Sequence, residues 1–147
     1  MIREDDRPRD LSEPLIERLV HEFYGRVRAD AVLGPIFEAR LAGRWDVHLA
    51  KMVDFWSSIA LKTGRYEGRP HAAHHGLGLD PAHFERWLRL FEATVRDLFD
   101  GAAAAFLIDR AHRIADSLQI GLNIGAKALH FPVRAATATP PNRTPDA

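Results

Sequence analysis

The chain contains no cysteine, which excludes disulfides, thiolate metal sites, iron–sulfur clusters and thiol nucleophiles. It also lacks an excess of either charge: 20 basic residues balance 20 acidic ones, so no overall field favours nucleic acid or an anionic membrane. No apolar run approaches the length of a membrane span, and the charged residues 1–10 do not resemble a signal peptide. The length of 147 residues predicts one domain. The absences favour the cytoplasm, with neither nucleic acid nor membrane as a partner.

The pattern of apolar residues predicts an all-α protein. Such residues recur at helical spacing, and no segment alternates with the period of a strand. The expected helices cover 12–30, 31–42, 44–62, 80–99 and 102–129, the second being short or only two turns. We expect one helical domain over 12–130 and a flexible segment over 1–11. Residues 131–147 are expected to be a disordered tail, because Ala, Thr, Pro and Asn dominate there.

Three of the eight histidines lie in the Gly- and Pro-rich connector 63–79, for which we expect a loop with one short turn around Ala72 and Ala73. A neutral imidazole on a loop is a good iron ligand, and His74 is the first candidate, with His71 and His75 as competitors. A zinc or nickel site made by His71 and His75 is a second interpretation. No Asp or Glu nearby in the sequence completes it.

The predicted helices also place polar groups on apolar faces. Tyr24 and Trp87 each carry a tip that needs a hydrogen-bond partner when buried. A bound diatomic ligand would supply one, and both side chains can donate to it and slow its release. His48, which stacks with Met52 at i, i+4 spacing, would stand at the mouth of such a pocket. There it would donate to the ligand, swing aside as a gate, or do neither, with Met52 and Phe23 as walls.

An ordered set of fragments runs from about Leu15 to Leu122. The set comprises Phe23-Tyr24 with Val27, Leu33-Gly34-Pro35-Ile36-Phe37, Trp45 with His48, Phe55-Trp56, Tyr66 with Gly68 and Pro70, His74, and Phe84 with Trp87 and Phe91. In this order and spacing the chain resembles the group III truncated haemoglobins.

The resemblance implies a truncated globin, a two-over-two helical sandwich that makes residues 12–130 a globin domain around one haem b. It implies His74 as the proximal iron ligand. Tyr24 and Trp87 would then be the distal pair, with His48 at the gate and Lys51 as partner of a haem propionate. The haem contacts it implies are Phe23, Tyr24, Phe37, His48, Lys51, Met52, Phe55, His74, Trp87 and Phe91.

The function expected on this basis is reversible binding of O2, NO or related diatomics. Conversion of NO to nitrate and peroxide chemistry are the candidate reactions, and either needs an unidentified reductase. Three other interpretations remain: a divalent-metal bundle held by His48, His112 and a loop histidine, a cofactor-free helical interaction module, and a haem gas sensor. The remaining histidines are expected to be solvated or structural: His21, His83, His112 and His130.

Overall fold

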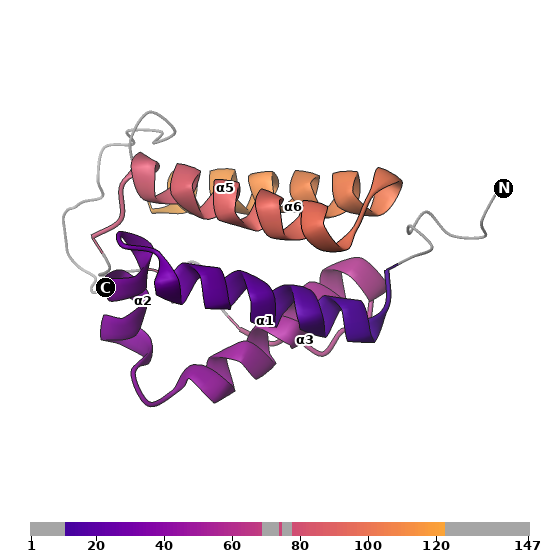
Figure 1. Ribbon diagram of the computed structural model, residues 1–147, viewed down its shortest axis with the longest axis horizontal. Helices are drawn as coiled ribbons and strands as arrows, with labels where there is room; N and C mark the ends of the chain where they lie inside the picture. The colour runs from indigo at the N-terminus through magenta and orange to yellow at the C-terminus, as the bar shows by residue number, and fades with distance from the viewer. Residues whose placement is uncertain (1–10, 69–73, 75–77, 123–147) are drawn as a thin grey trace, which may run out of the picture.

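The computed structural model describes residues 11–68, 74 and 78–122, and over these residues its regular structure is entirely helical. The helices are α1 (Glu13–Ala29), α2 (Leu33–Leu41), α3 (Trp45–Leu61), α5 (Pro81–Leu98) and α6 (Gly101–Gly121). Helices α5 and α6 form one layer and α1 and α3 the other, with α2 at one end (Figure 1). This arrangement confirms the two-over-two helical sandwich. Among the described residues, no helix is long and apolar enough to cross a membrane.

Local signals at the helix starts explain why the predicted helices form where they do. The Ser12 hydroxyl accepts a hydrogen bond from the Leu15 amide at 3.4 Å, and Pro14 occupies the first turn of α1, where its missing N–H costs nothing. At α5 the Asp80 carboxylate accepts from the His83 amide, while the His83 Nδ1 accepts from the Asp80 amide. His83 therefore has a structural role, as the sequence predicted.

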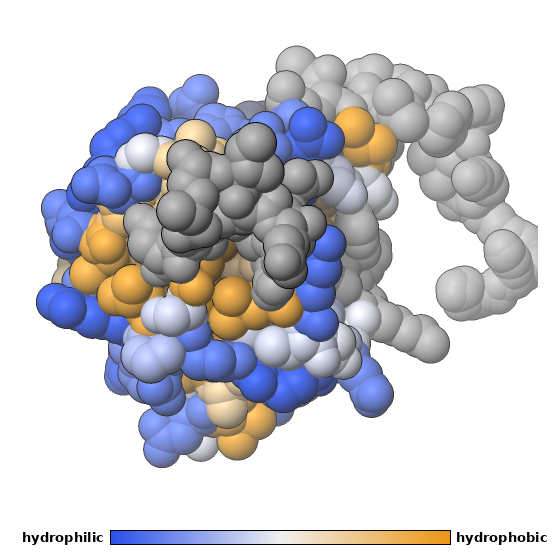
Figure 2. All heavy atoms as spheres, turned by 90° about the vertical axis from the view of Figure 1, so that its right-hand side faces the viewer, coloured by the Kyte–Doolittle hydropathy of each residue, from blue (hydrophilic) through white to orange (hydrophobic). Residues whose placement is uncertain are grey.

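The core lies between the two layers, where the apolar faces of α1 and α5 meet. Phe23 on α1 and Phe91 on α5 are fully buried, with ring centroids 5.1 Å apart in an edge-to-face contact. The other large, fully buried apolar side chains are Ile16, Leu19, Val20, Val27, Leu33, Val95 and Leu107. Figure 2 shows one end of the molecule, where hydrophobic residues gather in the middle and hydrophilic ones surround them.

The bounds of α6 differ from the predicted 102–129. The helix begins at Gly101, which adopts a φ of 55°, and it ends at Gly121 with Leu122 as its cap. Glycine costs about 1 kcal/mol in a helix interior relative to alanine, so Gly121 weakens this end of the helix. Leu11, assigned above to a flexible segment, is buried in the core. Residues 1–10, 123–130 and the predicted tail 131–147 lie outside the described residues.

A close approach between α1 and α2 makes Gly34 a sensitive position. A Cβ added there would lie 2.6 Å from the carbonyl oxygen of Arg28, a backbone atom that cannot move aside alone. We therefore expect Gly34→Ala to lower the free energy of unfolding by about 1–3 kcal/mol. The matched control is Gly25→Ala in the exposed middle of α1, where nothing lies within 4 Å. That change should raise stability by about 0.5–1 kcal/mol. Urea denaturation of both variants tests the pair, and equal effects would contradict the assignment.

Candidate functional site

Four aromatic rings from three helices meet at the end of the molecule where α2 lies. Tyr24 of α1 is buried, and its ring lies edge-on to Phe37 of α2 at a centroid distance of 6.0 Å. His48 of α3 stands perpendicular to the Tyr24 ring at 4.9 Å. Trp45, the first residue of α3, contacts both of these rings and stacks on Phe37 at 6.5 Å. The predicted distal residues Tyr24 and His48 are therefore direct neighbours.

The cluster continues into the other layer through Phe23. The Phe23 ring lies edge-on to Tyr24 at 4.8 Å and to Trp87 of α5 at 5.5 Å. Trp87 in turn stacks on Phe91 at 5.6 Å, and Phe91 stacks on Trp56 of α3 at 4.8 Å. One chain of ring contacts therefore links six predicted site residues, which are Phe23, Tyr24, Phe37, His48, Trp87 and Phe91.

The charge states of these groups follow from burial. Burial raises the pKa of the Tyr24 phenol well above its usual value, so the hydroxyl remains protonated and able to donate a hydrogen bond. Burial, with smaller electrostatic effects from His74 and Lys51, lowers the pKa of His48 from 6.5 to about 4. The His48 imidazole is therefore neutral near pH 7. Its Nε2 is buried and has no hydrogen-bond partner among the described residues, which is costly unless a ligand supplies one.

His74 on the connector acts electrostatically on His48, as does Lys51 of α3 itself. Tyr66 lies edge-on to Phe55 at 5.0 Å, and Phe55 follows His48 by about two helical turns, or ~10 Å. The start of the connector therefore lies along α3, whereas Leu79 at its other end packs against Phe84 of α5 and Ala115 and Leu118 of α6. His71, His75 and the predicted turn around Ala72 and Ala73 lie outside the described residues.

The start of the connector is anchored to two helices by Arg65. Its guanidinium binds Glu13 of α1 at 2.8 Å, Asp54 of α3 at 3.1 Å and the buried Ser57 hydroxyl at 3.0 Å. The Tyr66 amide donates to the Ser58 hydroxyl at 3.0 Å. These contacts fix where the connector leaves α3 before it reaches His74.

The apolar side chains around the unpaired nitrogen suit a large apolar ligand. Leu49, Met52 and Phe55 lie on α3 within two turns of His48 and remain half-buried, as do Phe37 and Trp87. Half-buried apolar side chains on the same helix as a neutral imidazole with an unpaired nitrogen match the requirements of haem, which is largely apolar with a metal at its centre. Lys51 is exposed at the edge of this region, where a carboxylate of the ligand would meet water.

The structure does not support a site that includes His112. The His112 Nε2 lies 2.5 Å from a carboxylate oxygen of Glu92 on the outer side of α5 and α6. Within residues 11–68, 74 and 78–122, no group of three or more His, Asp or Glu side chains could hold a metal ion. The divalent-metal bundle therefore gains no support from the described residues.

An all-helical two-layer fold, with the buried Tyr24 hydroxyl beside a neutral imidazole and a further histidine on the connector, matches the arrangement of a globin. The chain belongs to the bacterial-like globin family, whose sequence model matches residues 12–119. Globins are haem proteins, so the chain is a haem-binding globin with haem b as its cofactor, and small diatomic molecules such as O2 are its ligands.

Individual relatives agree with this family. The chain is 34% identical over 113 residues to the group 3 truncated hemoglobin ctb of Campylobacter jejuni, a match that covers 74% of this chain and 89% of the relative. It is 35% identical over 74 residues to the group 1 truncated hemoglobin GlbN of a Nostoc species, covering 50% and 60%. The crystal structure of the group III truncated hemoglobin from Campylobacter jejuni superposes with a TM-score of 0.72 at 32% identity, covering 79% and 94%. The resemblance to the group III truncated haemoglobins is confirmed.

Two residues of the site were not among the predicted cofactor contacts. Trp45 touches both Tyr24 and His48, and Tyr66 covers Phe55. The spacing of Trp45 and His48, one helical turn apart, is the signal that could have identified Trp45. No comparable signal exists for Tyr66, because its contact is made across the connector.

Proposed function

We propose that His74 holds the haem iron from the connector side, while Tyr24, Trp87 and His48 surround the ligand on the other side. The haem supplies an iron that binds diatomic molecules reversibly. The proposal rests on the pairing of a protonated, buried Tyr24 hydroxyl with the unpartnered Nε2 of His48, 4.9 Å from ring to ring. The Tyr24 hydroxyl and the His48 imidazole are both uncharged and both able to form a hydrogen bond, which suits a polarised, uncharged ligand.

The residues of this chain would bind, shield and orient that ligand. Tyr24 and Trp87 would donate hydrogen bonds to it, and Phe23 lies between them at 4.8 and 5.5 Å, which fixes the separation of the two donors. Phe37, Met52, Phe55 and Phe91 would wall the haem and exclude water. Lys51 would pair with a propionate at the exposed edge.

We further propose conversion of NO to nitrate as the reaction. Donors that retard the release of O2 favour chemistry on the bound ligand over its delivery. The conversion joins one NO to one O2 and takes up one electron to give nitrate, so an external one-electron reductase is required. Peroxide chemistry and a cytoplasmic location stay predictions from the sequence.

A reconstitution experiment tests the proposal. The purified chain is titrated with hemin, reduced with dithionite, exposed to O2 and mixed with NO. We expect one haem per chain and nitrate in proportion to the oxygenated protein. Haem uptake without nitrate would contradict the proposed reaction and leave the haem protein intact. A protein that stays colourless after hemin is added would favour the cofactor-free interaction module. Metal analysis that finds zinc and no porphyrin would favour the divalent-metal bundle.

A further inference from the structure

Trp45 joins the distal residues to the surface of the molecule. The side chain is buried, with 7% of the residue exposed, and its inner edge faces two of the proposed ligand contacts. The ring centroid lies 5.9 Å from that of His48 at an angle of 86° and 6.4 Å from that of Tyr24. Any shift of the Trp45 ring therefore changes the space in which the His48 imidazole rests.

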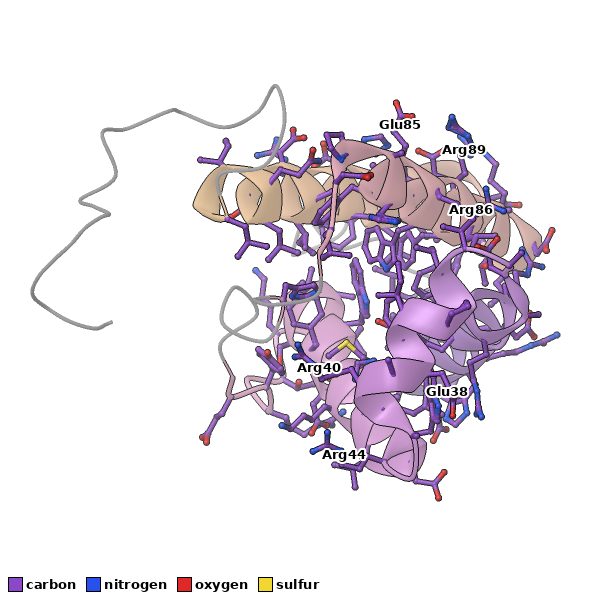
Figure 3. The ribbon with its side chains drawn as sticks, turned by 90° about the vertical axis from the view of Figure 1, so that its left-hand side faces the viewer. Glu38, Arg40, Arg44, Glu85, Arg86 and Arg89 are labelled. Carbon is purple, nitrogen blue, oxygen red and sulfur yellow. The ribbon has the colours of Figure 1, made fainter. Side chains whose placement is uncertain are left out.

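The outer side of Trp45 is held by an ion pair. The indole Nε1–H donates to a carboxylate oxygen of Glu38 on α2 at 2.9 Å. The guanidinium of Arg28 on α1 lies 4.4 Å from the indole ring centroid and 4.0 Å from the same Glu38 oxygen. Figure 3 shows Glu38 near the corner where α2 leads to α3. Arg28, Glu38 and Trp45, each from a different helix, thus contact one another.

The position of the His48 imidazole depends on packing and not on a hydrogen bond at Nε2. This nitrogen has no hydrogen-bond partner among the described residues, and the Tyr24 and Trp45 rings pack at right angles to the imidazole. We infer that Glu38 and Trp45 are positioning residues for His48, and that their hydrogen bond sets how readily His48 moves aside and admits a ligand to the haem. This inference rests on the proposed function, because it takes His48 to border the path of the ligand.

The test compares two substitutions of Glu38. Glu38→Ala removes the acceptor of the indole N–H, whereas Glu38→Gln keeps an oxygen that can still accept it. We expect the alanine variant to bind CO about three- to tenfold faster after flash photolysis, which lies within the range that the net contribution of one ordinary hydrogen bond spans. The glutamine variant should stay within about twofold of the parent. Trp45→Phe, which keeps a ring without the N–H, should match Glu38→Ala, and the double variant should be no faster than either.

A surface carboxylate outside this contact provides the matched control. Glu85 lies on α5 at the same end of the molecule and pairs with Arg89 at 3.6 Å, with both side chains about 70% exposed (Figure 3). Glu85→Ala removes the same charge and should leave CO binding unchanged. A Glu85→Ala variant as fast as Glu38→Ala would show that the charge alone matters and would overturn the inference.

A vibrational measurement separates positioning from loss of stability. The C–O stretching band of the ferrous CO complex reports the polar groups around the ligand, and a drop in melting temperature alone does not move it. We expect Glu38→Ala to shift weight toward the band seen in His48→Leu, and Glu38→Gln to restore the parent band. Identical bands and rates in the parent and Glu38→Ala would refute the role of Glu38. The CO complex of the parent protein is recorded first. If the parent forms no CO complex, that result counts against the proposed function and not against the role of Glu38.

Discussion

Replacing His74 with glycine should abolish stable haem binding. The proximal imidazole makes the bond that holds the iron to the protein. Its loss should lower the affinity for haem by more than the ~100-fold in metal affinity that is lost when a hydrogen-bond partner of a metal ligand is removed. His74 is the described connector residue that acts electrostatically on His48, and the connector is anchored by Arg65 to Glu13 and Asp54. The rate of hemin transfer to an excess of a haem-free acceptor globin measures the effect.

Two controls make the His74 experiment specific. His71→Ala and His75→Ala remove the competing imidazoles of the same connector and should leave the transfer rate and the ferrous spectrum unchanged. Imidazole added to the His74→Gly variant should restore a five-coordinate ferrous spectrum, because it fills the space that the side chain left. Unaltered haem retention in His74→Gly, with loss in His75→Ala or His71→Ala, would move the proximal role to that residue.

The fold was predictable because its signals are local. Ser12 and Asp80 cap helices through bonds to residues two or three positions away, and the buried faces follow from helical spacing. The end of α6 at Gly121 was not predictable from the sequence. One glycine costs ~1 kcal/mol in a helix, and whether the helix continues past it depends on packing contacts that the sequence does not reveal. Leu11 is buried by tertiary contacts that its own polar neighbourhood does not indicate.

The candidate site was predictable as a set of residue types and not as a geometry. Tyr24, His48 and Trp87 stood out because polar tips on apolar faces need partners. The choice of His74 over His71 and His75 came from the resemblance, because imidazoles one to four residues apart are chemically alike. The link from Glu38 through Trp45 to His48 is made by residues on two helices, so it exists only once the α2–α3 corner has formed.

Removing the Tyr24 hydroxyl should speed the release of O2 more than any other change on the distal side. The Tyr24→Phe variant keeps the edge-to-face contacts with Phe23 and His48 and loses only the donor. A hydrogen bond of about 1–2 kcal/mol to the ligand corresponds to a ~5- to 30-fold change in its release. Because burial raises the pKa of this phenol, the donor is present at every pH where the protein is folded, and the effect should not depend on pH.

The comparison of two ligands and a second tyrosine makes this prediction decisive. CO carries little negative charge on its outer atom, so its release should change far less than that of O2 in Tyr24→Phe. Tyr66→Phe, which removes a hydroxyl beside Phe55 on the connector, should alter neither rate. Trp87→Phe should accelerate O2 release as well, since it deletes the second donor across Phe23. Equal O2 release in the parent, Tyr24→Phe and Trp87→Phe, measured by stopped-flow displacement, would mean that these side chains only fill the core and that the ligand is bound elsewhere.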